Sequence, residues 1–99
     1  MESLGDILRQ QREKRSLLLR QVGASMEIDQ ALISKFERGE RKPTREQVLQ
    51  FAKLYDVNED DLLIAWLSDK LANEVQNELL GLKAMHVAEK KIKYQNRNK

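Results

Sequence analysis

The stretch VGASMEIDQALISKFERGERKPT, residues 22–44, decides the fold. Apolar residues recur at helical spacing as far as Met26, and a second periodic segment follows after Asp29, a residue type that caps helix N-termini. Gly39 ends this second helix, because glycine adopts a left-handed conformation without strain. Gly23 leaves room for close contact between the two helices. The stretch therefore predicts two short helices packed at close range across a tight turn, a helix-turn-helix motif.

Helical periodicity continues on both sides of this motif. Ser3 begins an amphipathic segment that extends to Gln11, and Thr44 with Gln47 has the spacing of a capping box. Asn58 precedes an acidic first turn, which suits a helix N-terminus. No segment shows the alternation of a strand, and one Pro and four Gly are too few for a turn-rich all-β chain. The sequence predicts an all-α fold, and the stripe of the fourth helix consists of Val48, Phe51, Ala52 and Tyr55.

The composition excludes several classes of protein. A chain of 99 residues has room for one compact domain and little more. Without Cys and with His86 as the single His, it has no disulfide, no thiol nucleophile and no two-histidine metal motif. No Gly-rich phosphate loop or catalytic carboxylate pair is apparent, so we expect no enzyme activity, cofactor, metal or small-molecule ligand. The absence of a signal peptide or membrane-length apolar run predicts a cytoplasmic protein without a membrane partner.

Basic residues gather around the end of the motif. Between residues 35 and 45 they outnumber the acidic residues Glu37 and Glu40, although the net charge of the whole chain is only +2. A cluster of this density favours a polyanionic partner, and an ordinary solvated face is the alternative. The basic residues are Lys35, Arg38, Arg41, Lys42 and Arg45.

From Leu4 to Leu63 the sequence resembles the Cro/repressor-type (XRE) helix-turn-helix family. LGDILRQQR, ALISKFERGERKPT and VLQFAKLYDVNEDDLL are similar to the opening helix, the third helix with its loop, and the closing helices of that family. The resemblance implies a five-helix repressor-type domain, residues 1–63, that binds double-stranded DNA. It also implies an ion pair between Arg12 and Glu37 that ties the first helix to the third, where two surface charges are the alternative.

Two positions depart from this family pattern. Leu19 stands where the family places a phosphate-contacting Gln, and Glu27 occupies a turn position that usually holds Gly. A left-handed backbone at Glu27 therefore costs more than usual. The run Leu17 to Leu19 is unusually apolar and adds to the core, with a protein-docking patch as the alternative.

The N-terminal part of the second helix of such a motif enters the major groove. Gln30 is suited to adenine and Lys35 to guanine, whereas Leu32 either contacts thymine methyl groups or is partly buried. The predicted base-contacting residues are Gln30, Ala31, Ser34 and Lys35. The predicted contacts to the DNA backbone are Arg20, Arg38, Arg41, Lys42 and Thr44.

Residues 64–99 form a helical extension with a second expected helix from Glu78 to Tyr94 and a frayed basic tail from Lys90. One domain contacts too few base pairs for genomic selectivity, and members of the resembled family pair on two half-sites. The apolar stripes of the extension predict a homodimer, and packing within one chain is the alternative. The predicted interface consists of Leu67, Leu71, Val75, Leu82, Met85 and Ile92.

The function that follows is a transcriptional regulator that acts as a homodimer on a palindromic operator. WLSDK and KAMHVAEKKIKY are similar to C-terminal extensions of regulators encoded beside DNA methyltransferases, which points to control of a restriction–modification operon. The alternatives are an antitoxin, a phage-type repressor, or a protein-interaction adaptor that has lost DNA binding.

Overall fold

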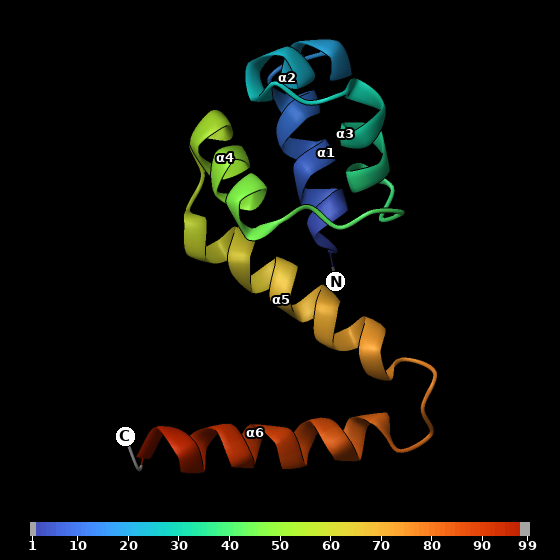
Figure 1. The fold of residues 1–99 in the computed structure, drawn as a ribbon, viewed down its shortest axis with the longest axis vertical. Coiled ribbons are helices and arrows are strands. Elements are labelled where there is room, and N and C mark those ends of the chain that lie inside the picture. The colour runs from blue at the N-terminus through green and yellow to red at the C-terminus, as the bar shows by residue number, and fades with distance from the viewer. Residues whose placement is uncertain (1, 98–99) are drawn as a thin grey trace. The chain divides into compact units, whose positions relative to one another are not determined.

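The computed structural model describes residues 2–97, and all regular structure in that range is helical (Figure 1). This confirms the predicted all-α fold. Contacts divide the chain into two units, one that extends to Asp69 and one that begins at Lys70. The helices are α1 (Leu4–Lys14), α2 (Leu19–Met26), α3 (Gln30–Glu37), α4 (Arg45–Tyr55), α5 (Glu59–Val75) and α6 (Gly81–Arg97).

Side-chain caps fix where three of the helices begin, as the sequence predicts. The Ser3 hydroxyl accepts a hydrogen bond from the backbone N–H of Asp6 at 3.2 Å, and the Asp6 carboxylate accepts one from the Ser3 N–H. Thr44 and Gln47 form the same reciprocal pair at the start of α4. The Asn58 side chain accepts a bond from a backbone N–H in the first turn of α5. These local bonds satisfy donors that a helix N-terminus otherwise leaves open.

The core of the first unit is closed by helices α1 to α5. The predicted stripe of α4 is buried throughout, with Phe51 stacked on Tyr55 at 6.0 Å and in edge contact with Phe36 at 6.2 Å between ring centres. Helix α2 packs against α3, and α1 packs against both α3 and α4. The remaining buried side chains include Leu4, Leu8, Val22, Ile33 and Leu62.

The part of α5 that belongs to the first unit extends beyond Leu63. Trp66 is half-buried against the core, and its Nε1–H donates to the backbone oxygen of Pro43 at 2.8 Å. The Asp69 carboxylate accepts a bond of 2.8 Å from the N–H of Leu4, the first residue of α1. The bond between Leu4 and Asp69 joins the two ends of the first unit, which explains why this unit continues to Asp69.

In the second unit, α6 begins at Gly81, later than the predicted start at Glu78. The chain first reverses through residues 76–80, so Leu79 and Leu80 lie in the turn and not on the helix. A Cβ atom at Gly81 would lie 2.6 Å from the backbone oxygen of Val75, so the glycine permits this tight reversal. The sequence pattern alone does not reveal this contact.

The basic tail, expected to fray, is helical as far as Arg97. An ion pair between Glu89 and Lys93, 3.6 Å apart and one turn from each other, supports the helix in this region. The last part of the expected tail, residues 98–99, lies outside the described residues. Between residues 2 and 97, no helix has the length and apolar character that a membrane span needs.

Candidate nucleic-acid interface

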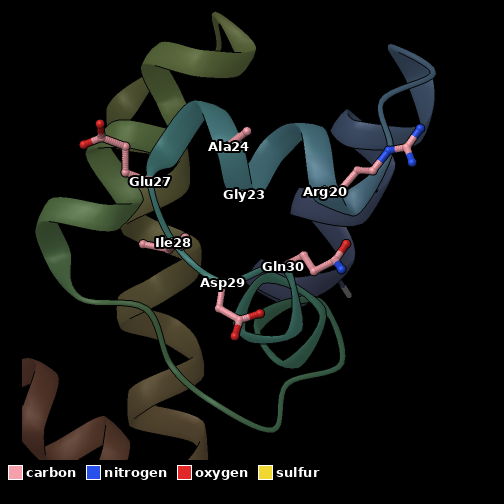
Figure 2. Close-up of a pocket in the computed structure, with 7 residues that line it drawn as sticks. All are labelled: Arg20, Gly23, Ala24, Glu27, Ile28, Asp29 and Gln30. Carbon is pink, nitrogen blue, oxygen red and sulfur yellow. The ribbon is translucent and has the colours of Figure 1, made fainter.

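The turn between α2 and α3 has the geometry expected of a helix-turn-helix motif (Figure 2). Glu27 adopts the left-handed conformation, with φ of 57°, and the N–H of Ile28 donates back to the oxygen of Gly23 at 3.0 Å. The Asp29 carboxylate then accepts a bond of 2.8 Å from the N–H of Ala31 and begins α3. The left-handed position predicted to be costly is therefore occupied by Glu27, outside the region that side chains prefer.

Gly23 is required for the close packing of the two helices. A Cβ atom there would lie 2.7 Å from the backbone oxygen of Ile28 and 3.2 Å from the backbone nitrogen of Gln30. Neither backbone atom can move away without displacing the turn. Beneath the turn, Ile33 is fully buried and Ile28 is half-buried against the core, which holds α3 in place.

The predicted base-contacting residues all lie on α3, with Gln30 and Ala31 in its first turn and Lys35 in its last. Gln30, Ala31 and Lys35 are exposed, and Ser34 is half-buried. Leu32, for which two roles were open, is half-buried and packs against the core. Gln30 shares one shallow hollow with the exposed residue Arg20 of α2 (Figure 2). A polar side chain from each helix of the motif is thus open to solvent at the same place.

The loop that follows α3 carries exposed cations. Arg38 forms an ion pair of 2.8 Å with Glu40, and both side chains are more than half exposed. Within residues 2–97 no ion pair engages Arg41 or Lys42. The Thr44 hydroxyl accepts the capping bond of α4 described above. Of the predicted backbone-contacting residues in this loop, Arg41 and Lys42 carry a positive charge that no carboxylate of the described chain neutralises.

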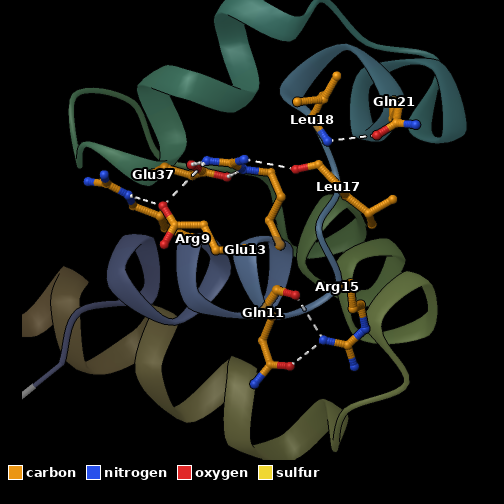
Figure 3. A network of polar contacts seen from close by, with 9 residues as sticks. Arg9, Gln11, Glu13, Arg15, Leu17, Leu18, Gln21 and Glu37 are labelled. Carbon is orange, nitrogen blue, oxygen red and sulfur yellow. Dashed lines mark hydrogen bonds and ion pairs between the residues drawn. The ribbon is translucent and has the colours of Figure 1, made fainter.

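An ion pair between α1 and α3 stiffens the support of the motif (Figure 3). Arg12 donates to the Glu37 carboxylate through Nε at 2.7 Å and Nη2 at 3.0 Å, and through Nη1 to the oxygen of Leu17 at 2.9 Å. The side chains of Arg12 and Glu37 are only 14% and 6% exposed. The hydrogen bond to Glu37 raises the pKa of Arg12 above its ordinary value. The pair that the family resemblance implies is confirmed.

Two contacts that the sequence did not predict involve residues of α5. The guanidinium of Arg45 lies over the Trp66 ring, 5.2 Å from its centre, and the Asp69 carboxylate accepts a hydrogen bond from the N–H of Leu4. A cation in the first turn of a helix opposes the helix dipole, so Arg45 was recognisable as an unusual residue from sequence. The bond of Asp69 depends on the direction of α5 across the core, and no local pattern predicts that direction.

The predicted dimer residues are placed on two helices. Leu67 is 41% exposed and Leu71 50% exposed on α5, while Leu82 and Ile92 on α6 are more exposed still. Val75 and Met85 are half-buried. Four of these six apolar side chains, Leu67, Leu71, Leu82 and Ile92, are therefore exposed in a single chain.

A left-handed turn, a capped second helix with an exposed polar end, and a cationic loop define a DNA-binding helix-turn-helix domain. The family model described as a helix-turn-helix domain matches residues 3–65, and the chain belongs to this family. No curated protein matches the chain. The protein is a DNA-binding regulator of the helix-turn-helix class.

Proposed function

We propose that this protein is a sequence-specific transcriptional regulator of the Cro/repressor (XRE) type, and that residues 1–63 form its five-helix DNA-binding domain. The observation that carries the proposal is the exposed N-terminal part of α3, held by the Asp29 cap and the close packing at Gly23. A rigid helix with free polar side chains at this end is suited to the major groove.

The base contacts follow from the chemistry of the exposed side chains. The Gln30 amide offers a donor and an acceptor that match N7 and N6 of adenine, and Lys35 donates to O6 and N7 of guanine. Ala31 is small and exposed, so it contacts thymine methyl groups without obstructing the helix. Ser34 adds a hydroxyl at the edge of this surface.

Contacts to phosphate come from the residues around α3. Arg41 and Lys42 are exposed cations without a carboxylate partner among residues 2–97. Arg20 and Arg38 add charge from α2 and from the start of the loop, and Thr44 marks the N-terminus of α4. Such contacts orient the domain and contribute affinity that falls as salt rises.

The protein acts as a homodimer in this proposal. The exposed apolar side chains of α5 and α6 support it, because a second copy provides the same surface in return. A dimer places two recognition helices on half-sites about one DNA turn apart, and the operator is then a palindrome. The similarity of the extension to controller-like regulators extends the proposal to a restriction–modification operon.

The test is binding of the intact protein to its own upstream region and to a scrambled duplex across a range of salt concentrations. We expect a specific complex whose affinity falls with salt. Arg41→Ala and Lys42→Ala each weaken both duplexes by similar factors and make the slope of log affinity against log salt shallower by about one.

Lys53→Ala is the matched control, because Lys53 is an exposed cation in the last turn of α4. This variant keeps the parental slope. The absence of any salt-dependent specific complex contradicts the proposal and favours an adaptor. Co-purification of a second small protein that blocks DNA binding points to an antitoxin instead.

A further inference from the structure

One side chain of α5 contacts both sides of the junction between the cationic loop and α4. Trp66 donates its Nε1–H to the oxygen of Pro43, the residue before the Thr44 cap. Its ring also lies beneath the guanidinium of Arg45, the first residue of α4, at 5.2 Å. Trp66 therefore fixes the end of the loop through a hydrogen bond and the start of the next helix through a cation–π contact.

Arg45 occupies an electrostatically unfavourable place for a cation. The N-terminal end of a helix has a partial positive charge, and acidic residues are favoured there. No carboxylate among residues 2–97 forms an ion pair with Arg45. The cation–π contact with Trp66 holds the side chain at this place without neutralising its charge. The local structure thus maintains an exposed, uncompensated positive charge.

The guanidinium of Arg45 also has donors available, because no carboxylate among residues 2–97 pairs with it. A guanidinium is planar, and its N–H groups point outward in that plane. An edge of this group that no carboxylate occupies is able to form two parallel bonds to one phosphate group. Because the ring restricts the side chain beforehand, less rotational freedom is lost when the phosphate binds.

We infer that Arg45 is a further contact to the DNA backbone and that Trp66 is a positioning residue that holds it for this contact. The inference rests on the proposed function, since it adds a phosphate contact to the same interface. It extends that interface beyond the loop of Arg41 and Lys42 onto the first turn of α4, and it gives a residue of α5 a role in DNA binding.

The first experiment measures the salt dependence of binding for Arg45→Ala, using the upstream duplex and a random duplex. We expect weaker binding to both duplexes by similar factors and a slope shallower by about one, since one phosphate contact is lost. Lys53→Ala removes a charge from the other end of α4 and keeps the parental slope. The inference is overturned if Lys42→Ala makes the slope shallower and Arg45→Ala leaves it unchanged. That result leaves the proposed function intact.

A parent protein without salt-dependent DNA binding overturns the proposed function, and this inference with it. The two failures are therefore distinguishable within one set of measurements.

The role of Trp66 is tested with Arg45→Lys and with two Trp66 variants. Lysine keeps the charge but lacks the planar, paired donors, so we expect weaker binding than the parent. Trp66→Phe retains an aromatic face, so we expect the parental slope of log affinity against log salt. Trp66→Leu should make this slope shallower, as Arg45→Ala does. In the double variant Arg45→Ala/Trp66→Leu, the slope falls no further than in Arg45→Ala alone.

Circular dichroism confirms that each variant is folded before binding is measured. Additive losses of slope in the double variant mean that Trp66 acts independently of Arg45, which overturns the positioning role. Parental affinity of Arg45→Lys overturns that role as well, and this variant does not disturb the core because Arg45 is exposed.

Discussion

The two units of this chain differ in how far their apolar side chains are exposed to solvent. In the first unit, Phe51, Tyr55 and Ile33 are fully buried, and the core is closed by residues from all of its helices. In the second unit, Leu71 is half exposed and Leu82 is 81% exposed, while Gly81 is the buried residue of α6. A closed core needs nothing more to be stable, whereas an open apolar surface in water favours association.

The contrast between the two units is tested most directly by a charged substitution on the exposed apolar surface of the second unit. Leu71→Asp should separate the proposed dimer, because association would bury an unpaired carboxylate. Affinity for an operator with two half-sites then falls by about 10²–10⁴-fold, since the second half-site is no longer bound intramolecularly. Sedimentation gives the oligomeric state, and titration with operator DNA gives the affinity.

Asn73→Asp adds the same charge at an exposed position of α5 outside the predicted interface and serves as the control. A monomeric parent, with Leu71→Asp bound to the full operator as tightly as the parent, would show that the extension forms no dimer interface.

The first unit should lose stability when one member of its interhelical ion pair is removed. Arg12→Ala leaves the Glu37 carboxylate, only 6% exposed, without its bidentate partner. We expect a loss of about 3 kcal/mol in the free energy of unfolding, at the low end for buried pairs because Arg12 keeps some contact with water. Urea denaturation measures this loss.

Arg9→Ala removes an arginine from an exposed ion pair with Glu13 in the same helix. This variant should leave the midpoint of urea denaturation unchanged. Equal effects of the two substitutions would mean that the enclosed pair stabilises the unit no more than the exposed one.

Substitution of an exposed residue on α3 should change DNA binding without changing dimerisation or folding stability. Gln30→Ala is expected to weaken specific binding by about 1–3 kcal/mol and to relax the preference at one base pair of each half-site. The free energy of unfolding stays unchanged, since Gln30 is exposed and makes no core contact. Affinities for operator and scrambled duplexes give the specificity ratio, and an unaltered ratio would remove Gln30 from the base contacts.

The smallest effect concerns a polar atom inside the closed core. The Tyr55 hydroxyl is buried and has no hydrogen-bond partner among residues 2–97, and burial raises its pKa to about 12. The unfolded chain releases this proton near pH 10, so the folded state loses stability as the pH rises from there to the folded pKa. At pH 11 this loss is about 1.4 kcal/mol relative to neutral pH.

Tyr55→Phe lacks this proton and should not show that part of the alkaline destabilisation. The check is the difference between parent and variant in urea denaturation at pH 7 and pH 11. A parent and variant that lose stability in parallel would show that Tyr55 does not titrate in this range.

The same contrast explains how much the sequence could predict. The caps at Thr44 and Asn58 and the stripe of α4 depend on neighbours within a few residues, so periodicity and residue type were sufficient. The left-handed position at Glu27 was indicated by the resemblance to a known family. The Arg12–Glu37 pair is distant in sequence, and only the resemblance to a known family indicated it.

What could not be predicted depends on contacts between distant segments or on chain reversal. Nothing in the periodicity of residues 78–94 shows that Gly81 must lie against Val75, so the start of α6 was placed too early. The bond of Trp66 to Pro43 and its contact with Arg45 require the path of α5 across the loop.

The bond between the Leu4 N–H and the Asp69 carboxylate also has a consequence for the order of events during synthesis. The two residues are 65 positions apart, so the first helix is made long before the carboxylate that accepts the N–H of its first residue. At about 5–20 residues per second, a ribosome needs roughly 3–13 s to add them. During this interval α1 to α4 lack Trp66 and Asp69, and the DNA-binding unit completes its core only as the end of α5 emerges.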